Sequence, residues 1–286
     1  MPPDRCYLCA SASLVPYARR MALPHVRCRN CGLIVRHPLP SETGDEGWYQ
    51  EGYYADRETY PDWEGDPHLA VLLAHRLRRI EVFCSPPGRI LDVGCGLGHF
   101  LKLARAHGWD AIGTDTSAVA VERARCLARV EVIHGRLDQA KFPSRAFDAV
   151  CFWDVLEHLA EPRGALGEAH RLLRPGGLLA VSMPNVRGLR AGIERTRWRY
   201  FRPEFGHLMH YGPATLSRLL SDGGFRVTAV DTEGAFNLAA LTRAAPRVRQ
   251  LPAVRRLLSI AQRSLDSLVR ALGVGENMAA FAHRVP

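Results

Sequence analysis

From residue 89 onward, short apolar runs alternate with segments whose apolar residues recur every three or four positions. The short runs predict strands, and the longer periodic segments predict helices that pack through one face. We expect strands near 89–94, 110–115, 130–134, 147–153, 177–183, 225–231 and 277–285, and helices near 98–107, 117–128, 163–173 and 213–222. This alternation is typical of a parallel sheet covered by helices on both faces, so the predicted fold class is α/β.

Proline and glycine mark the ends of several predicted elements. A helical pattern opens at Pro67 and ends before Pro86. Pro175-Gly176-Gly177 is expected to end the fourth helix before the fifth strand begins. Residues 185–212 match no regular element, although they are rich in aromatic rings and histidines. Because they follow the carboxyl end of a parallel strand, where ligands bind in such sheets, we interpret them as a substrate cap.

Residues 247–272 have the pattern of an amphipathic helix. Its apolar residues alternate at spacings of three and four, with arginines off that seam: Leu251, Val254, Leu258, Ala261, Leu265, Leu268 and Leu272. Binding to a membrane surface and pairing in a homodimer are both compatible with this pattern. We expect the helix to dock onto its own domain, because the seam lasts for barely three heptads.

Composition narrows the classes of protein that remain. The 286 residues, 47% of them hydrophobic, are enough for one sizeable core and a small accessory module. No apolar run reaches the roughly 18 residues of a membrane span, and residues 1–10 lack the pattern of a secretory signal, so we expect a cytoplasmic protein. The net charge of +9 comes from arginines scattered along the chain, with Lys102 and Lys141 as the only lysines. This dispersal disfavours nucleic acid as a partner.

Cysteine spacing predicts a separate module at the start of the chain. Cys6-x-x-Cys9 and Cys28-x-x-Cys31 form two knuckles that can present four thiolates to zinc. Four thiolates leave no open coordination position, so the expected metal is structural. Pairing of these cysteines in disulfides is the alternative. We therefore predict a zinc ribbon over residues 1–45, followed over 46–87 by an aromatic segment and a lead-in helix.

The aromatic segment contains six rings, and its role stays open between a flap over the active site and a packing surface for the ribbon: Trp48, Tyr49, Tyr53, Tyr54, Tyr60 and Trp63. The remaining residues, 88–286, form the predicted main domain.

An apolar strand that ends in a glycine turn and a helix spans residues 90–100. Glycines at 94, 96 and 98 allow a tight turn and close approach to a nucleotide. The third glycine comes one residue too early for a dinucleotide fingerprint. Asp92 would repel a pyrophosphate, whereas it suits a donor with an ammonium group and no phosphate, such as S-adenosylmethionine.

The run from Asp92 to Gly98 resembles motif I of class I methyltransferases. The segments 152–159, 172–177 and 183–185 resemble the downstream motifs of the same superfamily. Together these matches, which cover about residues 88–185, imply a Rossmann-like, seven-stranded methyltransferase fold, with S-adenosylmethionine as cofactor. The cysteine knuckles, Pro38-Leu39-Pro40 and the Tyr53-Tyr54 pair further resemble a bacterial subgroup that modifies sugars, polysaccharide precursors and other small metabolites.

Several residues after the strands are candidates for donor binding. Asp115 ends the second strand, where a carboxylate can accept both ribose hydroxyls, although it could instead be the N-cap of the next helix. In the region that contacts adenine, the family often has an acid where this chain has Arg136, so we expect Leu137 to make that contact and Asp138 to be a weaker candidate. The predicted donor-binding set is Asp92, Gly94, Cys95, Gly96, Gly98, Asp115, Thr116, Leu137 and Asp154.

Methyl transfer to a hydroxyl, or to a carbon beside a ketone, needs a base as well as a positioned donor. Histidine suits that role, and we expect His207 to serve, with His158 and His210 as further candidates. Each of the three has an ordinary alternative role, His158 in shaping its loop and the other two in packing the cap.

The sequence thus predicts an S-adenosylmethionine-dependent methyltransferase that acts on a small-molecule acceptor, with O-methylation of a sugar, polysaccharide precursor or secondary metabolite as the leading reaction. C-methylation of a keto sugar is the first alternative. An RNA methyltransferase is disfavoured, because residues 154–157 lack the Asn/Asp-Pro-Pro-aromatic box for base amines. An NAD-dependent oxidoreductase is disfavoured by Asp92 and the glycine spacing. The intact glycines, with Asp92 and Asp115, argue against a decayed, non-catalytic scaffold.

Overall fold

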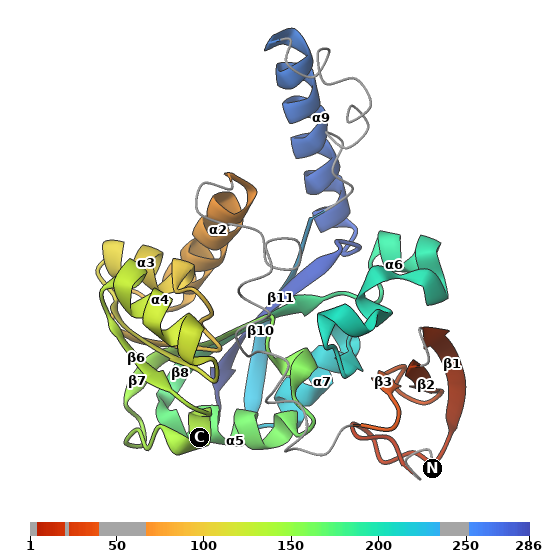
Figure 1. Ribbon diagram of the computed structural model, residues 1–286, viewed down its shortest axis with the longest axis horizontal. Helices are drawn as coiled ribbons and strands as arrows, with labels where there is room; N and C mark the ends of the chain where they lie inside the picture. Colours follow the sequence, from red (N-terminus) through yellow and green to blue (C-terminus); the bar gives the residue numbers. More distant parts are fainter. Residues whose placement is uncertain (1–4, 21–22, 40–66, 235–251) are drawn as a thin grey trace.

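The computed structural model describes residues 5–20, 23–39, 67–234 and 252–286 (Figure 1). The aromatic segment with Trp48, Tyr54 and Trp63 lies outside the described residues. Within the described chain, a large α/β body carries a small β module formed by its N-terminal residues, and one long helix projects away from the body (Figure 1).

A seven-stranded sheet forms the centre of the α/β body, in the order β10-β11-β8-β7-β4-β5-β6. The strands are β4 (Arg89–Val93), β5 (Asp110–Asp115), β6 (Glu131–His134), β7 (Phe147–Trp153), β8 (Leu173–Pro184), β10 (Phe225–Glu233) and β11 (Asn277–Arg284). The pairs from β8 through β6 are parallel, whereas β11 runs antiparallel to both β8 and β10. The predicted α/β class and all seven predicted strands are confirmed.

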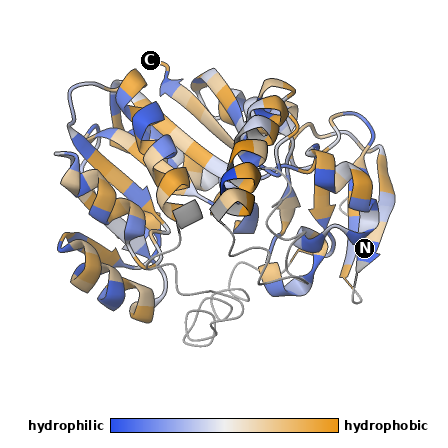
Figure 2. Ribbon diagram, turned by 90° about the horizontal axis from the view of Figure 1, so that it is seen from above, coloured by the Kyte–Doolittle hydropathy of each residue, from blue (hydrophilic) through white to orange (hydrophobic). Residues whose placement is uncertain are grey.

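Successive residues of the inner strands point to opposite faces of the sheet and enter two hydrophobic clusters. In β11, for example, Met278 and Ala280 belong to one cluster, and Ala279 and Phe281 belong to the other. Helices α2 (Pro67–Phe83), α3 (His99–Ala106) and α4 (Ala118–Ala128) contribute to one cluster, and α5 (Pro162–Leu172) and α7 (Pro213–Asp222) to the other. Figure 2 shows that these helices carry both hydrophobic and hydrophilic residues, as helices packed through one side should.

The expected break at Pro175-Gly176-Gly177 is wrong in position. Helix α5 already ends at Leu172, and the three residues lie inside β8. Leu173 pairs with Phe147 and Leu178 pairs with Ala149, so the intervening residues bulge out of the ladder. Gly176 has a φ of 75°, which a bulge of this kind accommodates at a glycine.

The N-terminal module, residues 5–39, contains β1 (Leu14–Arg20), β2 (Leu23–Cys28) and β3 (Ile34–Arg36), all antiparallel. Its fourth strand is β9 (Met209–His210), which comes from the predicted cap and pairs with β3. The module's sheet is therefore completed by a segment distant in sequence.

The expectation that residues 185–212 lack regular structure is wrong. They form α6 (Leu189–Glu194), three short 3₁₀ turns (Arg195–Arg197, Arg199–Phe201 and Pro203–Phe205) and β9. These elements are too short to produce a periodic pattern. Packing determines them instead, since Trp198 and Phe201 are fully or almost fully buried, in one cluster with Ile34 of β3.

The amphipathic helix is confirmed as α9 (Pro252–Ala271), but its docking onto the domain is limited to its last turns, where Val269 is buried and Arg270 contacts His75. The helix projects from the body (Figure 1), and Val269 in its last turn is the one large apolar side chain that is buried among those described in α9. Leu257, Leu268 and the following Leu272 are more than half exposed, at 67%, 56% and 64%. A seam of leucines predicts an amphipathic helix without identifying what covers it. No helix of the described residues is long and apolar enough to span a bilayer.

Candidate functional site

The residues predicted to bind the donor meet at one edge of the sheet. Asp92, Asp115 and Asp154 lie at or just beyond the carboxyl ends of β4, β5 and β7, and Leu137 follows β6. These four strands are neighbours in the order β7-β4-β5-β6. Because the carboxyl ends of parallel strands share an edge, the structure gathers these side chains around one crevice.

The glycine loop after β4 is held against β5. The N–H groups of Gly94 and Cys95 both donate to the carbonyl of Thr114, at 2.8 and 3.0 Å. Gly94 has a φ of 68°, and a Cβ at this position would lie 2.7 Å from a methyl carbon of Val155. Gly98, with a φ of 81°, begins α3 so close to α4 that a Cβ would lie 2.9 Å from the Cα of Ala124. The sequence needs glycine at both positions for this tight turn.

Asp115 holds the glycine loop through its carboxylate. The N–H of Gly96 donates to Oδ2 at 2.8 Å, and the N–H of Ser117 donates to Oδ1 at 2.9 Å. The alternative role of Asp115 as a helix N-cap is wrong, because Ser117 caps α4. Burial raises the pKa of Asp115, and these backbone hydrogen bonds oppose the rise. Each oxygen keeps acceptor capacity for a ligand hydroxyl.

Asp92 is a buried carboxyl group that lacks a complete set of partners. It is 2% exposed, and its Oδ1 has no hydrogen-bond partner among the described residues. Burial and, secondly, the nearby Asp115 raise the pKa of Asp92 well above its usual range, while Arg76 opposes the rise. An unpaired buried acceptor is costly, so this position suits a ligand that brings a cation or a hydrogen-bond donor.

Arg76 is a site residue that the sequence analysis missed. It comes from α2 and is 2% exposed. Its guanidinium donates to Oδ2 of Asp154 at 3.3 Å and to Oε2 of Glu233 at 3.4 Å, and it lies 4.9 Å from the ring centroid of Trp153. The sequence did contain a signal, because Arg76 lies on the apolar face of the helix that Leu73, Leu77 and Ile80 define. An arginine on such a face is buried only if it is paired with an acid, so a partner could have been expected.

The segment after β6 places two candidates in different environments. Leu137, in a 3₁₀ turn over Leu137–Gln139, is buried beside the core. The Asp138 side chain is 61% exposed and pairs with Arg136 at 3.2 Å. Leu137 therefore offers an apolar surface, whereas Asp138 is occupied with a neighbour. Thr116 is exposed, and its carbonyl oxygen lies 3.0 Å from Nε2 of His134.

A second cluster lies where the cap meets the turn after β7. His158 ends the 3₁₀ turn Leu156–His158, and His207 faces it from the cap with ring centroids 4.6 Å apart. Glu157 offers a carboxylate oxygen within 4.8 Å of a ring nitrogen from each histidine. The N–H of Leu208 donates to the carbonyl of Glu157 at 2.8 Å and ties the cap to this turn.

The protonation of this cluster follows from its burial. Burial lowers the pKa of His158 to about 4, and burial with the neighbouring His158 and His210 lowers the pKa of His207 well below its usual value. Both imidazoles are therefore neutral at pH 7 and able to accept a proton. Burial raises the pKa of Glu157 well above its usual value, and both of its carboxylate oxygens lack a hydrogen-bond partner among the described residues.

Glu157 was missed in the sequence, where the only signal was an acid before His158 in an otherwise apolar turn. Two histidines and a carboxylate can also hold a metal ion. His210 lies differently, in β9, where its ring packs 4.5 Å from Phe201 and 5.1 Å from His25. The cap thus joins His207 to His158 and leaves His210 at the junction with the N-terminal module.

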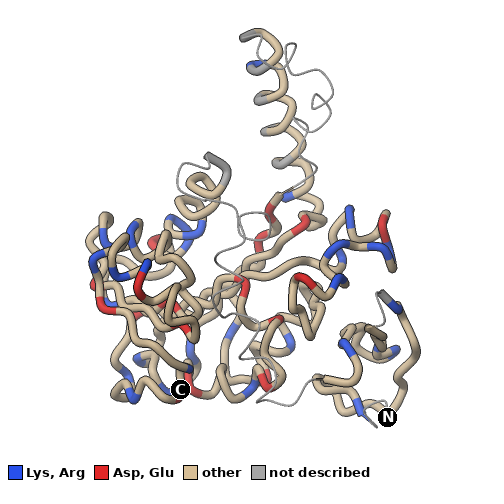
Figure 3. Tube along the Cα trace, viewed as in Figure 1, with Lys and Arg blue, Asp and Glu red and all other residues tan. Residues whose placement is uncertain are grey.

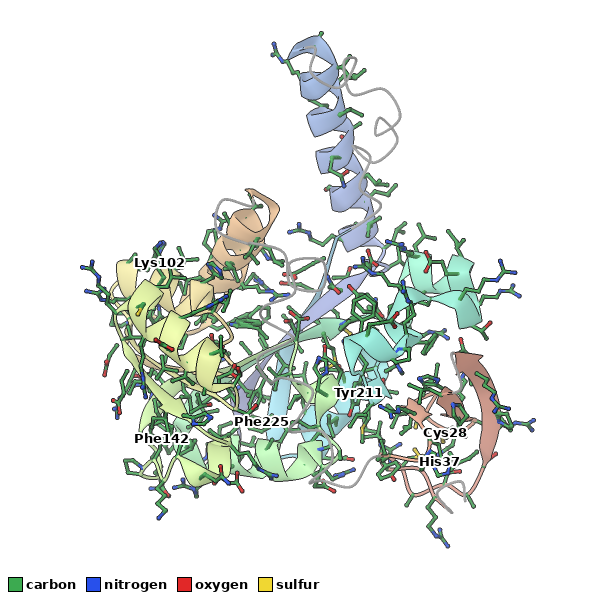
Figure 4. All side chains as sticks on the ribbon, in the orientation of Figure 1. Cys28, His37, Lys102, Phe142, Tyr211 and Phe225 are labelled. Atoms are coloured by element: carbon green, nitrogen blue, oxygen red, sulfur yellow. The ribbon has the colours of Figure 1, made fainter. Side chains whose placement is uncertain are left out.

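The four predicted metal ligands come together in the N-terminal module, around Cys28 (Figure 4). The Sγ atoms of Cys6 and Cys31 are 3.5 Å apart, and those of Cys9 and Cys28 are 3.6 Å apart. A zinc ion with four sulfurs at about 2.3 Å separates neighbouring sulfurs by about 3.8 Å, close to these distances. All four are free cysteines, and the separations far exceed a disulfide bond of about 2.05 Å.

The sheet order, the glycine loop and the carboxylates at the strand ends define an α/β fold with a crevice suited to a nucleoside cosubstrate. A family profile described as a methyltransferase domain matches residues 66–230. The chain belongs to this family and is an S-adenosylmethionine-dependent methyltransferase.

Individual relatives agree with this assignment. A probable S-adenosylmethionine-dependent methyltransferase of Mycolicibacterium smegmatis is 33% identical over 71% of this chain and 70% of its own length. The mitochondrial ubiquinone biosynthesis O-methyltransferase of Schizosaccharomyces pombe is 33% identical over 44% of this chain and half of its own length. The crystal structure of a SAM-dependent methyltransferase from Archaeoglobus fulgidus has the same fold, with a TM-score of 0.56 and 23% identity over 81% of this chain and 99% of that one.

Proposed function

We propose that the protein transfers the methyl group of S-adenosylmethionine to an oxygen of a small molecule, such as a sugar, a polysaccharide precursor or a secondary metabolite. The observation that carries the proposal is the pair of neutral, partly buried histidines, His158 and His207, where the cap meets the turn that follows β7. The relatives include an O-methyltransferase, which agrees with transfer to oxygen, and C-methyltransferases, which agree with the alternative. Methylation of a carbon beside a ketone, the alternative, would use the same base.

The donor would bind at the strand ends. We assign the ribose hydroxyls to Asp115, the adenine to Leu137 and the close backbone approach to residues 94–98, with Thr116 at the rim. The ammonium group would satisfy the buried carboxyl of Asp92. Arg76 holds Asp154 in place and would keep the wall of the crevice rigid, since Asp154 has a φ of 58° that an unsupported aspartate rarely keeps.

On the acceptor side, we assign the base to His207. As the acceptor oxygen attacks the methyl carbon, the carbon–sulfur bond breaks, the sulfonium becomes a neutral thioether, and the hydroxyl proton passes to the imidazole of His207. Glu157 would stabilise the resulting imidazolium, because a buried cation needs a paired or hydrogen-bonded environment. His210 is the weaker candidate, because packing between Phe201 and His25 already accounts for its position.

We also propose that Cys6, Cys9, Cys28 and Cys31 bind one structural zinc ion. Residues 1–45 would then be a zinc ribbon that supports the cap through the β3–β9 pair. An RNA acceptor finds little support, because the histidines lie within a packed cap, and the arginines are dispersed over the body. Because the chain belongs to the methyltransferase family, we do not retain the NAD-dependent oxidoreductase as an alternative.

One experiment tests the reaction class and the acceptor together. Purified protein is incubated with methyl-labelled S-adenosylmethionine and fractionated lysate, and labelled products are identified by mass spectrometry. We expect the label in a small-molecule fraction. A labelled nucleic-acid fraction would overturn the proposed acceptor class.

The base assignment is tested with His207→Ala. General-base catalysis contributes roughly 10² to 10⁴ in rate, so we expect kcat to fall by about that factor while the affinity for S-adenosylhomocysteine stays unchanged. His107→Ala is the matched control, because His107 is partly exposed and pairs with Glu81 at the end of α3. Normal turnover by His207→Ala would contradict the assignment. A bound metal ion that Cys28→Ser keeps and His207→Ala loses would instead indicate a metal held by Glu157 and the two histidines.

A further inference from the structure

An apolar surface is formed by α9 and α6 together. Leu257, Ile260, Leu268 and the following Leu272 are between 46% and 67% exposed. At 3.6 residues per turn, these four positions fall on one side of the helix axis. Leu189 and Ile193 of α6, 43% and 63% exposed, extend the set.

The two helices are joined where this surface continues from one to the other. The N–H of Leu189 donates to the carbonyl of Val274, three residues after the end of α9, at 2.8 Å. The N–H of Val274 in turn donates to the carbonyl of Val269 in the last turn of α9, at 3.0 Å. The six exposed residues therefore belong to one structural unit, and monomeric proteins rarely leave such a patch exposed without a use.

The sequence of the two helices contains more basic than acidic residues. The sequence of α9 contains four arginines, at 255, 256, 263 and 270, against one acid, Asp266. The segment 189–197 contains three arginines and Glu194, and Arg190 already pairs with Glu194 at 2.7 Å. Arg195 and Arg197 are exposed. Figure 3 shows basic residues on α6 and at the base of α9, with acidic residues interspersed in both places.

We propose that this surface binds an anionic membrane, with α9 lying in the headgroup region and its leucines inserted between the lipids. A helix with a broad apolar side, a basic polar side and no ability to span the bilayer is the kind that binds at such an interface. The arginines complement the negative potential of anionic lipids.

A second copy of the chain fits this surface less well. Pairing two α9 helices would bring arginine-rich segments together with one aspartate each to offset them, and like charges destabilise such pairs. The apolar side is also wider than a coiled-coil seam, because Leu257 and Ile260 lie off the 254–258–261–265 series. Nucleic acid would use the arginines but would leave the leucines in water.

Co-sedimentation of the full-length protein with vesicles tests the proposal. Vesicles of equal parts phosphatidylglycerol and phosphatidylcholine should bring down the protein, and vesicles of phosphatidylcholine alone should bring down at least tenfold less. Leu257→Glu and Leu268→Glu should each lower binding to the anionic vesicles by at least tenfold. Val82→Glu, at a 70% exposed valine near the end of α2, is the matched control and should bind as the wild type does.

Binding of S-adenosylhomocysteine by each variant confirms that the protein has folded, because α9 lies outside the donor crevice. The proposal is overturned if the wild type does not bind the anionic vesicles. It is also overturned if Leu257→Glu and Leu268→Glu bind them as tightly as the wild type does. A concentration-dependent dimer that Leu268→Glu abolishes, without vesicle binding, would assign the surface to a second copy. Retention on RNA in place of vesicles would assign it to nucleic acid.

Discussion

Asp92 and Asp115 lie at the ends of adjacent strands, and both are almost fully buried. Burial raises the pKa of both carboxyl groups, and the nearby Asp115 raises the pKa of Asp92 further. Two backbone hydrogen bonds offset the free-energy cost of burying the Asp115 carboxylate, whereas Asp92 keeps one oxygen without a partner among the described residues. A cationic donor would lower the free energy of this arrangement by pairing with it, which couples the stability of the crevice to occupancy.

Replacing Asp115 tests the donor assignment. Asp115→Ala removes acceptors for the ribose hydroxyls and for the N–H of Gly96, so we expect the Kd for S-adenosylhomocysteine to rise at least about tenfold, or about 1.4 kcal/mol. Titration calorimetry measures the change. Asp110→Ala is the control at the other end of β5, where the side chain is 70% exposed and pairs with Arg89. Equal affinities for the two variants would show that Asp115 does not contact the donor.

The strand-end residues could be predicted from sequence because each lies beside a local signal. Asp92 precedes a glycine turn, and Asp115 ends an apolar run, so their shared edge follows from parallel pairing alone. Arg76 and Glu157 could not be predicted in the same way. Each is buried only because segments far apart in sequence close over it, and single-sequence patterns carry no record of such contacts.

Among the elements, the coupling between the N-terminal module and the cap has the clearest functional consequence. β9 is a strand of the module's sheet, and it lies in the same segment as His207. Tyr211, fully buried next to β9, packs in a core cluster that includes residues of both the module and α7 (Figure 4). Disorder in the module would therefore displace the cap while leaving the donor crevice intact.

Removal of one sulfur tests this coupling. We expect Cys28→Ser to lose its zinc, as measured by atomic absorption, because four-thiolate sites contribute directly to folding. Methyl transfer should fall about tenfold or more, while the Kd for S-adenosylhomocysteine stays within about twofold, because the donor crevice does not depend on β9. Cys126→Ser, at an exposed cysteine of α4, is the control. Full activity in metal-free protein would refute both the zinc site and its role.

Element prediction succeeded where one periodicity runs for several turns or residues. Helix α2 matches its expected start at Pro67, and β7 matches its expected bounds, because core burial reinforces the local pattern in both. It failed for β9, which has two residues and exists only through pairing with β3. For α9 the pattern was sufficient to predict the helix. It could not predict what the apolar side of the helix contacts, because amphipathicity does not specify a partner.

The pH dependence of stability is a property of the whole molecule, to which several buried groups contribute. Burial lowers the pKa of His25 and of His158 to about 4, below the ordinary value of 6.5. In this range the unfolded chain binds protons that the folded chain excludes, so each histidine makes the protein less stable as pH falls from 6.5 toward 4. The raised pKa values of Asp92 and Glu157 act in the opposite direction, because the folded chain keeps their protons as pH rises.

Substitution of His25 separates its contribution from the others. His25 lies in the module against Phe201 and His210, so Phe is a suitable apolar replacement. Between pH 6.5 and 5, the free energy of unfolding of the wild type should fall by up to about 2 kcal/mol more than that of His25→Phe. Urea unfolding at both pH values measures this difference.

The pairing of β3 with β9 also determines the order in which the molecule can be completed during synthesis. Ile34–Arg36 leave the ribosome long before Met209 and His210 are translated, so the edge of β3 waits unpaired while most of the central sheet is made. The cysteines can collect a metal ion during that interval, since all four precede β3. The N-terminal module would then already be folded around its metal ion when the later cap segment is made. Its β3 edge would serve as the template with which β9 pairs.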